Sequence, residues 1–302
     1  MEKWFCSFYN SRKEGLDDPL SVRFAGHDAA GRGICLFEKY QALAGVSLRA
    51  GLRFNAISGF ISAGIMAVLL GFQLEWSAYS LALALAMSLC GLGYSLLSFR
   101  VMKLGGMALY TTFLMSGGML LPYVFGVLFW GEPLTLVRLA AVILILVAVI
   151  LTNLTRSEPS GKLLLLCGCV FVLNGLVSIL SKGHQITLTR PTVSSFSFVM
   201  YSSLCKGMLS SLALLLHKPQ ASQPAAKMPV GLVAGAAVIG AASYLLQLIG
   251  AKALPASVLY PMITGGSILF SGIVARWVFK ETLTRLQMIS LSACFIGTLM
   301  FL

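Results

Sequence analysis

The sequence has few charged residues for its length, and its apolar part has almost no carboxylates. Only 11% of the 302 residues are charged and 58% are apolar, whereas a soluble globular domain has about 25% charged residues. Six of the ten acidic residues fall within the first 54 positions. Because so few charges could not cover a water-facing surface of this size, the composition excludes most soluble enzyme classes and indicates a polytopic membrane protein.

Cysteine and histidine are not spaced for a metal or redox site. The seven cysteines include no pair separated by two residues, which such chemistry usually needs. Five of them lie within apolar runs, where free cysteine behaves as a small hydrophobe. The three histidines, His27, His184 and His217, are scattered over the N-terminal segment and predicted loops. We therefore expect no metal and no cofactor.

Long apolar runs are what the sequence does have. Crossing a hydrocarbon core about 30 Å thick takes roughly 20 helical residues. Nine runs of about this length are present, at residues 55–72, 77–97, 105–129, 134–152, 163–180, 192–216, 230–250, 257–277 and 283–302. Short connections join them, as expected of a bundle whose backbone groups must be satisfied within lipid. The predicted fold is an all-α polytopic membrane bundle with nine transmembrane helices.

The second half of this bundle repeats the first. A shift of 149 positions superposes residues 77–152 on the last three predicted helices without a gap. Matching Leu and Gly residues alone would be weak evidence, but polar matches support them. Lys103 falls on Lys252, and the segment Glu132-Pro-Leu-Thr falls on Glu281-Thr-Leu-Thr. Five crossings separate the matched helices, so the two repeats are inverted in the membrane, as in many secondary transporters.

The repeat divides the chain into four parts. Residues 1–54 are a polar N-terminal segment, 55–153 the first repeat with four helices, 154–161 a linker and 162–302 the second repeat with five helices. Either a first helix has been lost or replaced, or the protein has nine spans and an unusual N-terminus. Within the N-terminal segment, residues 33–54 are either a basic amphipathic helix on the membrane surface or poorly ordered.

The pattern resembles the EamA-like members of the drug/metabolite transporter superfamily, over about residues 55–302. Each repeat of that family closes with a helix rich in small residues, a Glu-x-Leu turn and a final apolar helix. The residues that carry this pattern are Gly117, Gly118, Pro122, Gly126, Glu132 and Leu134 in the first repeat, and Pro261, Gly265, Gly266, Glu281 and Leu283 in the second. The resemblance implies a ten-helix (5+5) fold and export or exchange of amino acids, metabolites or drugs. It also makes residues 5–13 similar to the end of the family's first helix, with residues 22–54 as an insertion.

Lys206 is the sharpest candidate for a transport residue. It lies about ten residues from either end of its predicted helix, some 15 Å deep at 1.5 Å per residue. An intramembrane cation is costly and usually faces the bundle interior or a wet cavity. Ser202 and Ser203 lie near it at helical spacing. The alternative is a structural lysine that donates to helix-end carbonyls or is drawn to a break near Gly207.

Other polar residues within the helices are weaker candidates for the transport pathway. We expect Asn174, Tyr94, Tyr201, Tyr244 and Gln247 to line a cavity, with the last three lying deepest. Buried amides and hydroxyls also join helices to one another, and tyrosines near helix ends often form an interface belt. Helix packing is therefore an open alternative for each of these residues.

The remaining motif residues have structural explanations. Glu132 and Glu281 each precede a predicted helix, where a carboxylate complements the positive end of the helix dipole; a latch between the repeats is the alternative. Gly117, Gly118, Gly265 and Gly266 allow close helix packing. Pro122 should kink its helix, and kinked helices also serve as hinges.

These residues together predict a secondary transporter of small metabolites, such as amino acids or organic anions, rather than an enzyme. The alternatives are a membrane-embedded lipid-modifying enzyme and a non-transporting partner subunit. Enzymatic chemistry needs an acid/base pair, metal ligands or an activated nucleophile, and the predicted helices contain no carboxylate or histidine. For the same reason, facilitated diffusion or exchange fits better than coupling through a carboxylate.

The loop charges predict how the chain crosses the membrane. The loops after the second, fourth, sixth and eighth helices hold nine Lys and Arg residues: Arg100, Lys103, Arg156, Lys162, Lys218, Lys227, Arg276, Lys280 and Arg285. The other loops hold four, namely Arg138, Lys182, Arg190 and Lys252. The positive-inside rule places the first set in the cytoplasm. We expect a multi-pass protein of the cell membrane, a monomer or homodimer, whose net charge of +12 contacts the lipid bilayer and not nucleic acid.

Overall fold

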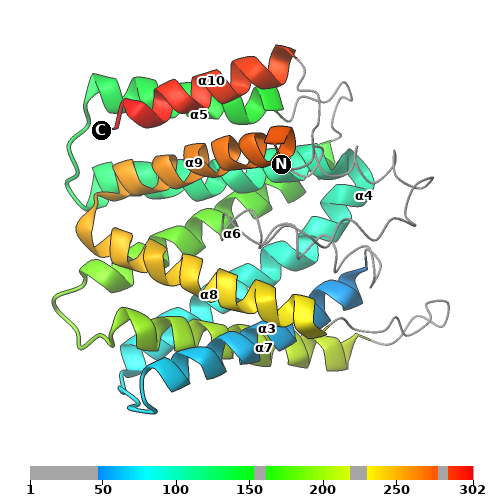
Figure 1. Ribbon diagram of the computed structural model, residues 1–302, viewed down its shortest axis with the longest axis vertical. Coiled ribbons are helices and arrows are strands. Elements are labelled where there is room, and N and C mark those ends of the chain that lie inside the picture. Colours follow the sequence, from blue (N-terminus) through cyan, green and yellow to red (C-terminus); the bar gives the residue numbers. More distant parts are fainter. Residues whose placement is uncertain (1–46, 153–160, 218–229, 278–284, 302) are drawn as a thin grey trace.

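The computed structural model describes residues 47–152, 161–217, 230–277 and 285–301, and the regular elements in these ranges are all helices. They are α3 (Leu48–Leu69), α4 (Ala78–Phe129), α5 (Leu136–Thr152), α6 (Gly161–Ile186), α7 (Ser195–Leu216), α8 (Val230–Ala253), α9 (Ala256–Trp277) and α10 (Arg285–Leu299). Figure 1 shows them lying side by side, from the α5 and α10 pair at the top to the α3 and α7 pair at the bottom.

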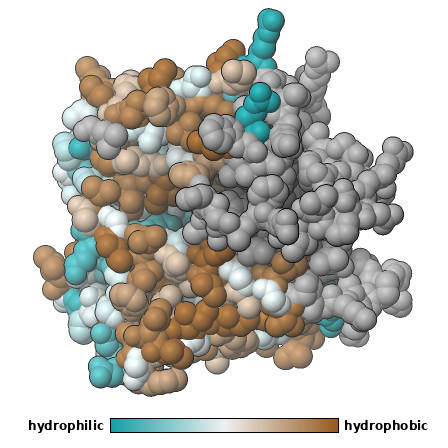
Figure 2. Space-filling model, viewed as in Figure 1, coloured by the Kyte–Doolittle hydropathy of each residue, from teal (hydrophilic) through white to brown (hydrophobic). Residues whose placement is uncertain are grey.

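The helices have the length and composition of membrane spans. Six segments are long and apolar enough to cross a bilayer, and three shorter apolar helices, Leu136–Leu151, Ala256–Phe270 and Arg285–Leu299, accompany them. Exposed side chains on these helices include Leu136, Leu215 and Leu246, and apolar side chains cover much of the described surface in Figure 2. In water such a surface would aggregate, so the fold is that of a polytopic helical membrane protein, as predicted.

Helix α4 folds back on itself and supplies two of the predicted spans. A Cβ atom placed on Gly93 would lie 3.1 Å from Leu173 in α6, and one placed on Gly117 would lie 2.7 Å from Cα of Phe171, also in α6. In a straight helix Gly93 and Gly117 would be about 36 Å apart at 1.5 Å per residue. Both halves of α4 therefore contact the same turns of α6, and Figure 1 shows α4 turning back at its label.

Several helix boundaries differ from the prediction. α3 begins at Leu48, not at residue 55, because the Ser47 side chain caps it by accepting a hydrogen bond from the Ala50 N–H at 3.2 Å. Residues 48–54 therefore belong to the first span, and our assignment of 33–54 to a single surface or poorly ordered segment is wrong in that part. Residues 33–46, like residues 1–32, lie outside the described residues.

Helix α6 continues to Ile186, six residues beyond the predicted end. Lys182 and His184, which we assigned to a loop, are thus helical, and both are buried. The apolar run ends at Leu180, but these polar side chains find partners inside the bundle, so hydropathy alone placed the boundary too early.

Several contacts join the two halves of the chain. α3 packs on α7, the second half of α4 on α9, and α5 on α10. In addition α3 contacts α8 while α4 contacts α7, which is the exchange expected when a two-fold axis relates the repeats. The boundaries of the repeats themselves stay a prediction.

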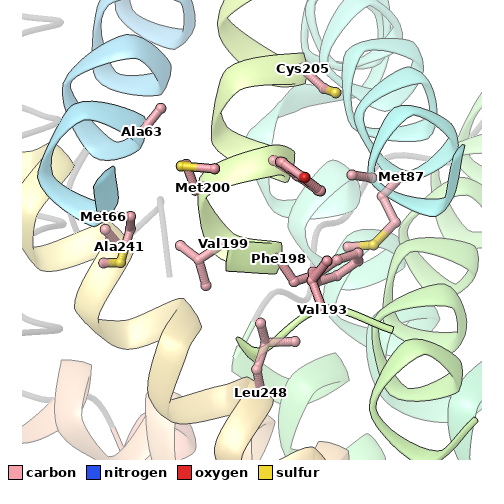
Figure 3. Close-up of a cluster of buried hydrophobic side chains, with 12 residues drawn as sticks. Ala63, Met66, Met87, Val193, Phe198, Val199, Met200, Cys205, Ala241 and Leu248 are labelled. Atoms are coloured by element: carbon pink, nitrogen blue, oxygen red, sulfur yellow. The ribbon is translucent and has the colours of Figure 1, made fainter. Parts of the chain in front are cut away.

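The largest buried cluster joins both halves of the chain. Side chains of α3, α4, α7 and α8 meet around Phe198 and Leu248, which are fully buried, with Met66, Met87 and Met200 filling the space between them (Figure 3). Glycine allows α3 and α7 to approach closely beside it, because a Cβ on Gly59 would lie 2.7 Å from the backbone nitrogen of Gly207.

Candidate functional site: Lys206 and the neighbouring hydroxyl groups

One end of the bundle, which we call the tied end, is held together by hydrogen bonds between the two halves of the chain. It is the end at which α4 and α7 begin. The Ser77 hydroxyl donates to the Pro191 carbonyl at 2.6 Å, and the Ser80 hydroxyl oxygen accepts from the Val193 N–H at 3.1 Å. Ser80 also lies 2.9 Å from Nε2 of His184, whose ring stacks on Phe198. The starts of α4 and α7 and the end of α6 are therefore fixed to one another.

Glu75, in the turn before α4, adds to this end. Its carboxylate accepts from the Ser194 backbone N–H at the start of α7, and its carbonyl accepts from the Tyr201 hydroxyl. Partial burial alone would raise the pKa of Glu75, but hydrogen bonds from Ser194 and Ser197 outweigh it and hold that pKa below its usual value. Glu75 thus joins the α3–α4 turn to α7 as a carboxylate.

Glu132 caps a helix of the other half of the chain. Its two carboxylate oxygens accept from the backbone N–H groups of Ala256 and Ser257 at 2.6 and 2.7 Å, at the start of α9. Gly131 precedes it with a φ of 66°, which glycine adopts without penalty, and the turn brings Glu132 back beside Gly126. Our prediction that Glu132 caps its own following helix is wrong, since that helix, α5, begins only at Leu136. The alternative, a latch between the repeats, stays a prediction.

Lys182 binds the C-terminal end of α8, the helix that precedes α9. Its Nζ donates to the carbonyls of Ala251 and Leu254, both at 2.5 Å, and the side chain is only 4% exposed. The Glu132 carboxylate is near enough to interact with it electrostatically. A cation at the C-terminus of α8 and an anion at the N-terminus of α9 complement both helix dipoles at the α8–α9 turn.

The centre of the bundle lies beyond the tied end. Going along α4 and α7 from their adjacent starts, the Ser88 hydroxyl donates to the Ser202 carbonyl at 3.2 Å. The next turns of these two helices carry Tyr94 and Lys206. Tyr94 is half-buried and packs with Tyr110 and Cys167, whereas Lys206 is exposed. Lys206 therefore lies one helical turn beyond the contact between Ser88 and Ser202.

The Lys206 side chain is exposed although it lies near the middle of α7. Lys206 makes no hydrogen bond or ion pair with any residue of the described ranges. The only carboxylates in those ranges, Glu75 and Glu132, are both at the tied end. The ammonium group of Lys206 therefore has no protein counter-charge among the described residues.

Hydroxyl groups extend from this cation toward the tied end. Ser202 precedes Lys206 by one helical turn and is within hydrogen-bonding reach of the Tyr244 hydroxyl. That hydroxyl also lies 3.3 Å from Ser181 Oγ. Gln247 and Ser181 are within reach of the Tyr260 hydroxyl, which donates to the Ser178 carbonyl at 2.6 Å. A chain of neutral polar groups thus runs from the central cation to the helix ends held by Lys182 and Glu132.

Not every candidate residue belongs to this group. Ser202, Tyr244 and Gln247 belong to the chain of hydroxyl and amide groups next to Lys206, whereas Tyr94 packs with Tyr110 and Cys167. Three others lie at helix contacts. Tyr201 binds the Glu75 carbonyl, Ser203 lies against Gly59 at the crossing of α3 and α7, and Asn174 Nδ2 donates to the Leu114 carbonyl of α4 at 2.7 Å. We expected Tyr201 to be among the deepest, but its hydroxyl is at the tied end.

The glycine and proline residues of the motif occupy different surroundings. Gly117 and Gly118 face Phe171 and Asn174 of α6, and Gly265 faces Thr298 of α10. Gly266, in contrast, has open space where its Cβ would be. Pro122 and Pro261 lie inside α4 and α9. Glu281 is outside the described residues, so its predicted role stays a prediction.

Sequence reasoning missed Lys182, Ser181 and Tyr260. Lys182 follows the last apolar residue of its run, so it was counted with the loop charges, and nothing in the local sequence marks the carbonyls that it binds 69 and 72 positions away. The 149-residue shift pairs Tyr260 with Thr111, a polar match that could have pointed to it. Within the described ranges, no three His, Cys, Asp or Glu side chains come together in a way that could hold a metal ion.

Part of the chain matches a known protein family. Residues 160–302 match the EamA-like transporter family. No curated protein matches the sequence. Among solved structures 28 chains match. One of them, titled only "Crystal structure of protein", is 16% identical in sequence to this chain. The match covers 90% of this chain and 94% of the chain in that structure, with a TM-score of 0.68. At that identity the likeness shows the fold alone.

The family match covers α6 to α10, the five helices of the predicted second repeat, and the structural likeness extends the fold over nearly the whole chain. Residues 160–302 are therefore similar to the EamA-like transporter family, and the protein is a multi-pass helical membrane protein.

Proposed function

We propose that the protein is a secondary transporter of small metabolites, such as amino acids or organic anions, and that the substrate passes through the centre of the bundle by alternating access between two inverted repeats. The observation that carries this proposal is the exposed ammonium group of Lys206 near the middle of α7, which has no partner among the described residues. A charge is expensive within a membrane bundle and is kept where it serves a pathway. The EamA-like second half supports the same function.

Lys206 is the counter-charge for an anionic group of the substrate in this proposal. The ammonium group has no carboxylate partner among the described residues, so a bound anion gains an attraction that no internal ion pair offsets. The predicted helices hold no carboxylate or histidine at mid-depth that could carry a coupled proton. Export, exchange or facilitated diffusion of the substrate is therefore favoured over proton coupling through a carboxylate.

The tied end is the closed side of the pathway. Glu132 and Glu75 bind helix starts of the second half from the first half there, and Lys182 binds the end of α8 from α6 within the second half. Alternating access requires these contacts to separate while the opposite end closes. Because the positive-inside rule places that opposite end in the cytoplasm, the proposal makes this conformation inward-facing, in the cell membrane.

The proposal is tested with purified protein in two steps. A thermal-stability screen in detergent covers amino acids, organic anions, sugars and lipophilic cations, because a ligand that binds only the folded state stabilises it by RT ln(1 + [L]/Kd). Each stabilising compound is then assayed for counterflow into proteoliposomes. We expect Lys206→Met to lose both stabilisation and counterflow, and Lys252→Met, a lysine in the last turn of α8, to keep both.

Two results would contradict the proposal. If no compound is exchanged by the wild type, while the protein always copurifies with another chain, the protein is a partner subunit and not a carrier. If counterflow persists unchanged in Lys206→Met, the protein transports but Lys206 does not bind the substrate. Lys206→Arg keeps the charge and serves as the variant that separates loss of charge from loss of fold.

A further inference from the structure

The polar groups that accompany Lys206 in the centre are neutral. Ser202 lies one turn before Lys206 on α7, and the Tyr244 hydroxyl of α8 is within hydrogen-bonding reach of Ser202 and 3.3 Å from Ser181. Residues four apart on a helix have Cβ atoms about 5–6 Å apart. A single small ligand that binds the ammonium group of Lys206 therefore also reaches hydroxyl groups that donate and accept hydrogen bonds.

Carboxylates of the described ranges are unavailable to such a ligand. Glu132 is bound to the N-terminus of α9 and Glu75 to Ser194, both at the tied end. A ligand ammonium group in the centre would meet Lys206 and no anion among the described residues. Two like charges a few ångströms apart repel strongly when protein surrounds them, so the described site favours a ligand whose second polar group is uncharged.

Resting on the proposed function, we infer that the substrate is a small organic anion that carries a neutral hydroxyl or keto oxygen near its carboxylate, and not a zwitterionic amino acid. The carboxylate pairs with Lys206, and the neutral oxygen hydrogen-bonds within the group formed by Ser202, Tyr244 and Ser181. The charge at Lys206 provides the affinity, and the hydroxyl groups distinguish the substrate from other anions.

Ligands with the same carbon skeleton test this inference. One set is lactate, alanine and propionate, and a longer set is 4-hydroxybutyrate, 4-aminobutyrate and butyrate. Dissociation constants are measured by thermal shift and by competition for counterflow of labelled lactate or 4-hydroxybutyrate. In at least one set we expect the hydroxy acid to bind about tenfold or more tightly than the amino acid, a difference of about 1.4 kcal/mol. The acid without a second polar group should fall between them.

Two tyrosine variants locate the second contact. Tyr244→Phe removes this hydroxyl and should reduce the preference for the hydroxy acid over the unsubstituted acid. The matched control is Tyr123→Phe, because the Tyr123 hydroxyl is buried without a hydrogen-bond partner and lies in the cluster of α4, α5, α9 and α10. This control should keep the full preference.

The outcomes separate this inference from the proposed function. Preference for the hydroxy acid that depends on Lys206 and Tyr244 supports both. If the amino acid binds equally or more tightly and is transported, the inference is overturned and the transporter stands. If anions bind equally well to Lys206→Met, both the inference and the role of Lys206 are overturned. A preference unchanged in Tyr244→Phe overturns the assignment of the hydroxyl group.

Discussion

Lys182 and Lys206 both lie on helices that cross the bundle, but their ammonium groups have opposite surroundings. Lys182 is 4% exposed and donates to two carbonyls beside the Glu132 carboxylate. Lys206 is exposed and has no partner among the described residues. The first cation is satisfied by the fold itself, whereas the second is left available for something that the fold does not provide. The comparison separates a structural charge from a binding charge.

The comparison is tested most strongly by removing each charge in turn. Lys182→Met leaves the carbonyls of Ala251 and Leu254 without a donor and Glu132 without its neighbouring cation, so we expect a loss of about 3–5 kcal/mol in the free energy of unfolding. Lys206→Met removes an unpartnered charge, and we expect a change of about 1 kcal/mol or less. Chemical unfolding of both variants in one detergent measures the difference. Equal losses would mean that Lys206 is also structural.

The fold and the central lysine could be predicted from the sequence for a simple reason. Apolar run length fixes the number of spans, and a charge ten residues inside a span has few explanations, so the helices and Lys206 were found. Lys182 is two residues past the end of its run, where local sequence cannot tell a loop charge from a buried one. Its partners are two carbonyls at the C-terminal end of α8, far along the chain. Only the folded backbone brings Lys182 and these carbonyls together.

Glu132 also has a partner that the local sequence could not predict. Its place before an apolar run is typical of a helix cap, and it does cap a helix, but that helix is α9 and not α5. The sequence pattern predicts that the carboxylate binds a helix N-terminus. It does not predict which helix provides that N-terminus. That choice depends on how the two halves pack.

A second prediction concerns the close contact between α4 and α6. A Cβ on Gly117 would lie 2.7 Å from Cα of Phe171, whereas its repeat counterpart Gly266 has nothing within 4 Å. Because backbone atoms cannot yield as a side chain can, Gly117→Ala should cost about 1–3 kcal/mol. Gly266→Ala should be neutral or slightly stabilising, since alanine favours a helix. Thermal unfolding of the matched pair measures this. A large loss in Gly266→Ala would contradict the open space seen on α9.

A third prediction tests whether Glu132 and Lys182 stabilise the tied end together. Glu132→Gln keeps the shape but turns one oxygen into a donor that faces an N–H group, so we expect a loss of about 1–2 kcal/mol, less than in Lys182→Met. Because the two side chains hold the same turn, the double variant should lose less than the sum of the single losses. Additive losses in a double-mutant cycle would show that the two caps act separately, and the tied end would then be a set of independent contacts.

The smallest expected effect is a dependence on pH at the exposed edge of the tied end. The pKa of Glu75 is held below its usual value of 4.5 by the hydrogen bonds from Ser194 and Ser197. A carboxylate whose folded pKa is lowered contributes stability that is present above its unfolded pKa and is lost as pH falls through the folded pKa. The melting temperature should therefore decline below about pH 4.5, and this decline should be shallower in Glu75→Gln. Because the side chain is exposed, solvent screens the interaction, and the difference between the two slopes should be small. A slope unchanged in Glu75→Gln would mean that other carboxylates produce the acid response, and would leave Lys182 and Glu132 as the contacts that matter at this end.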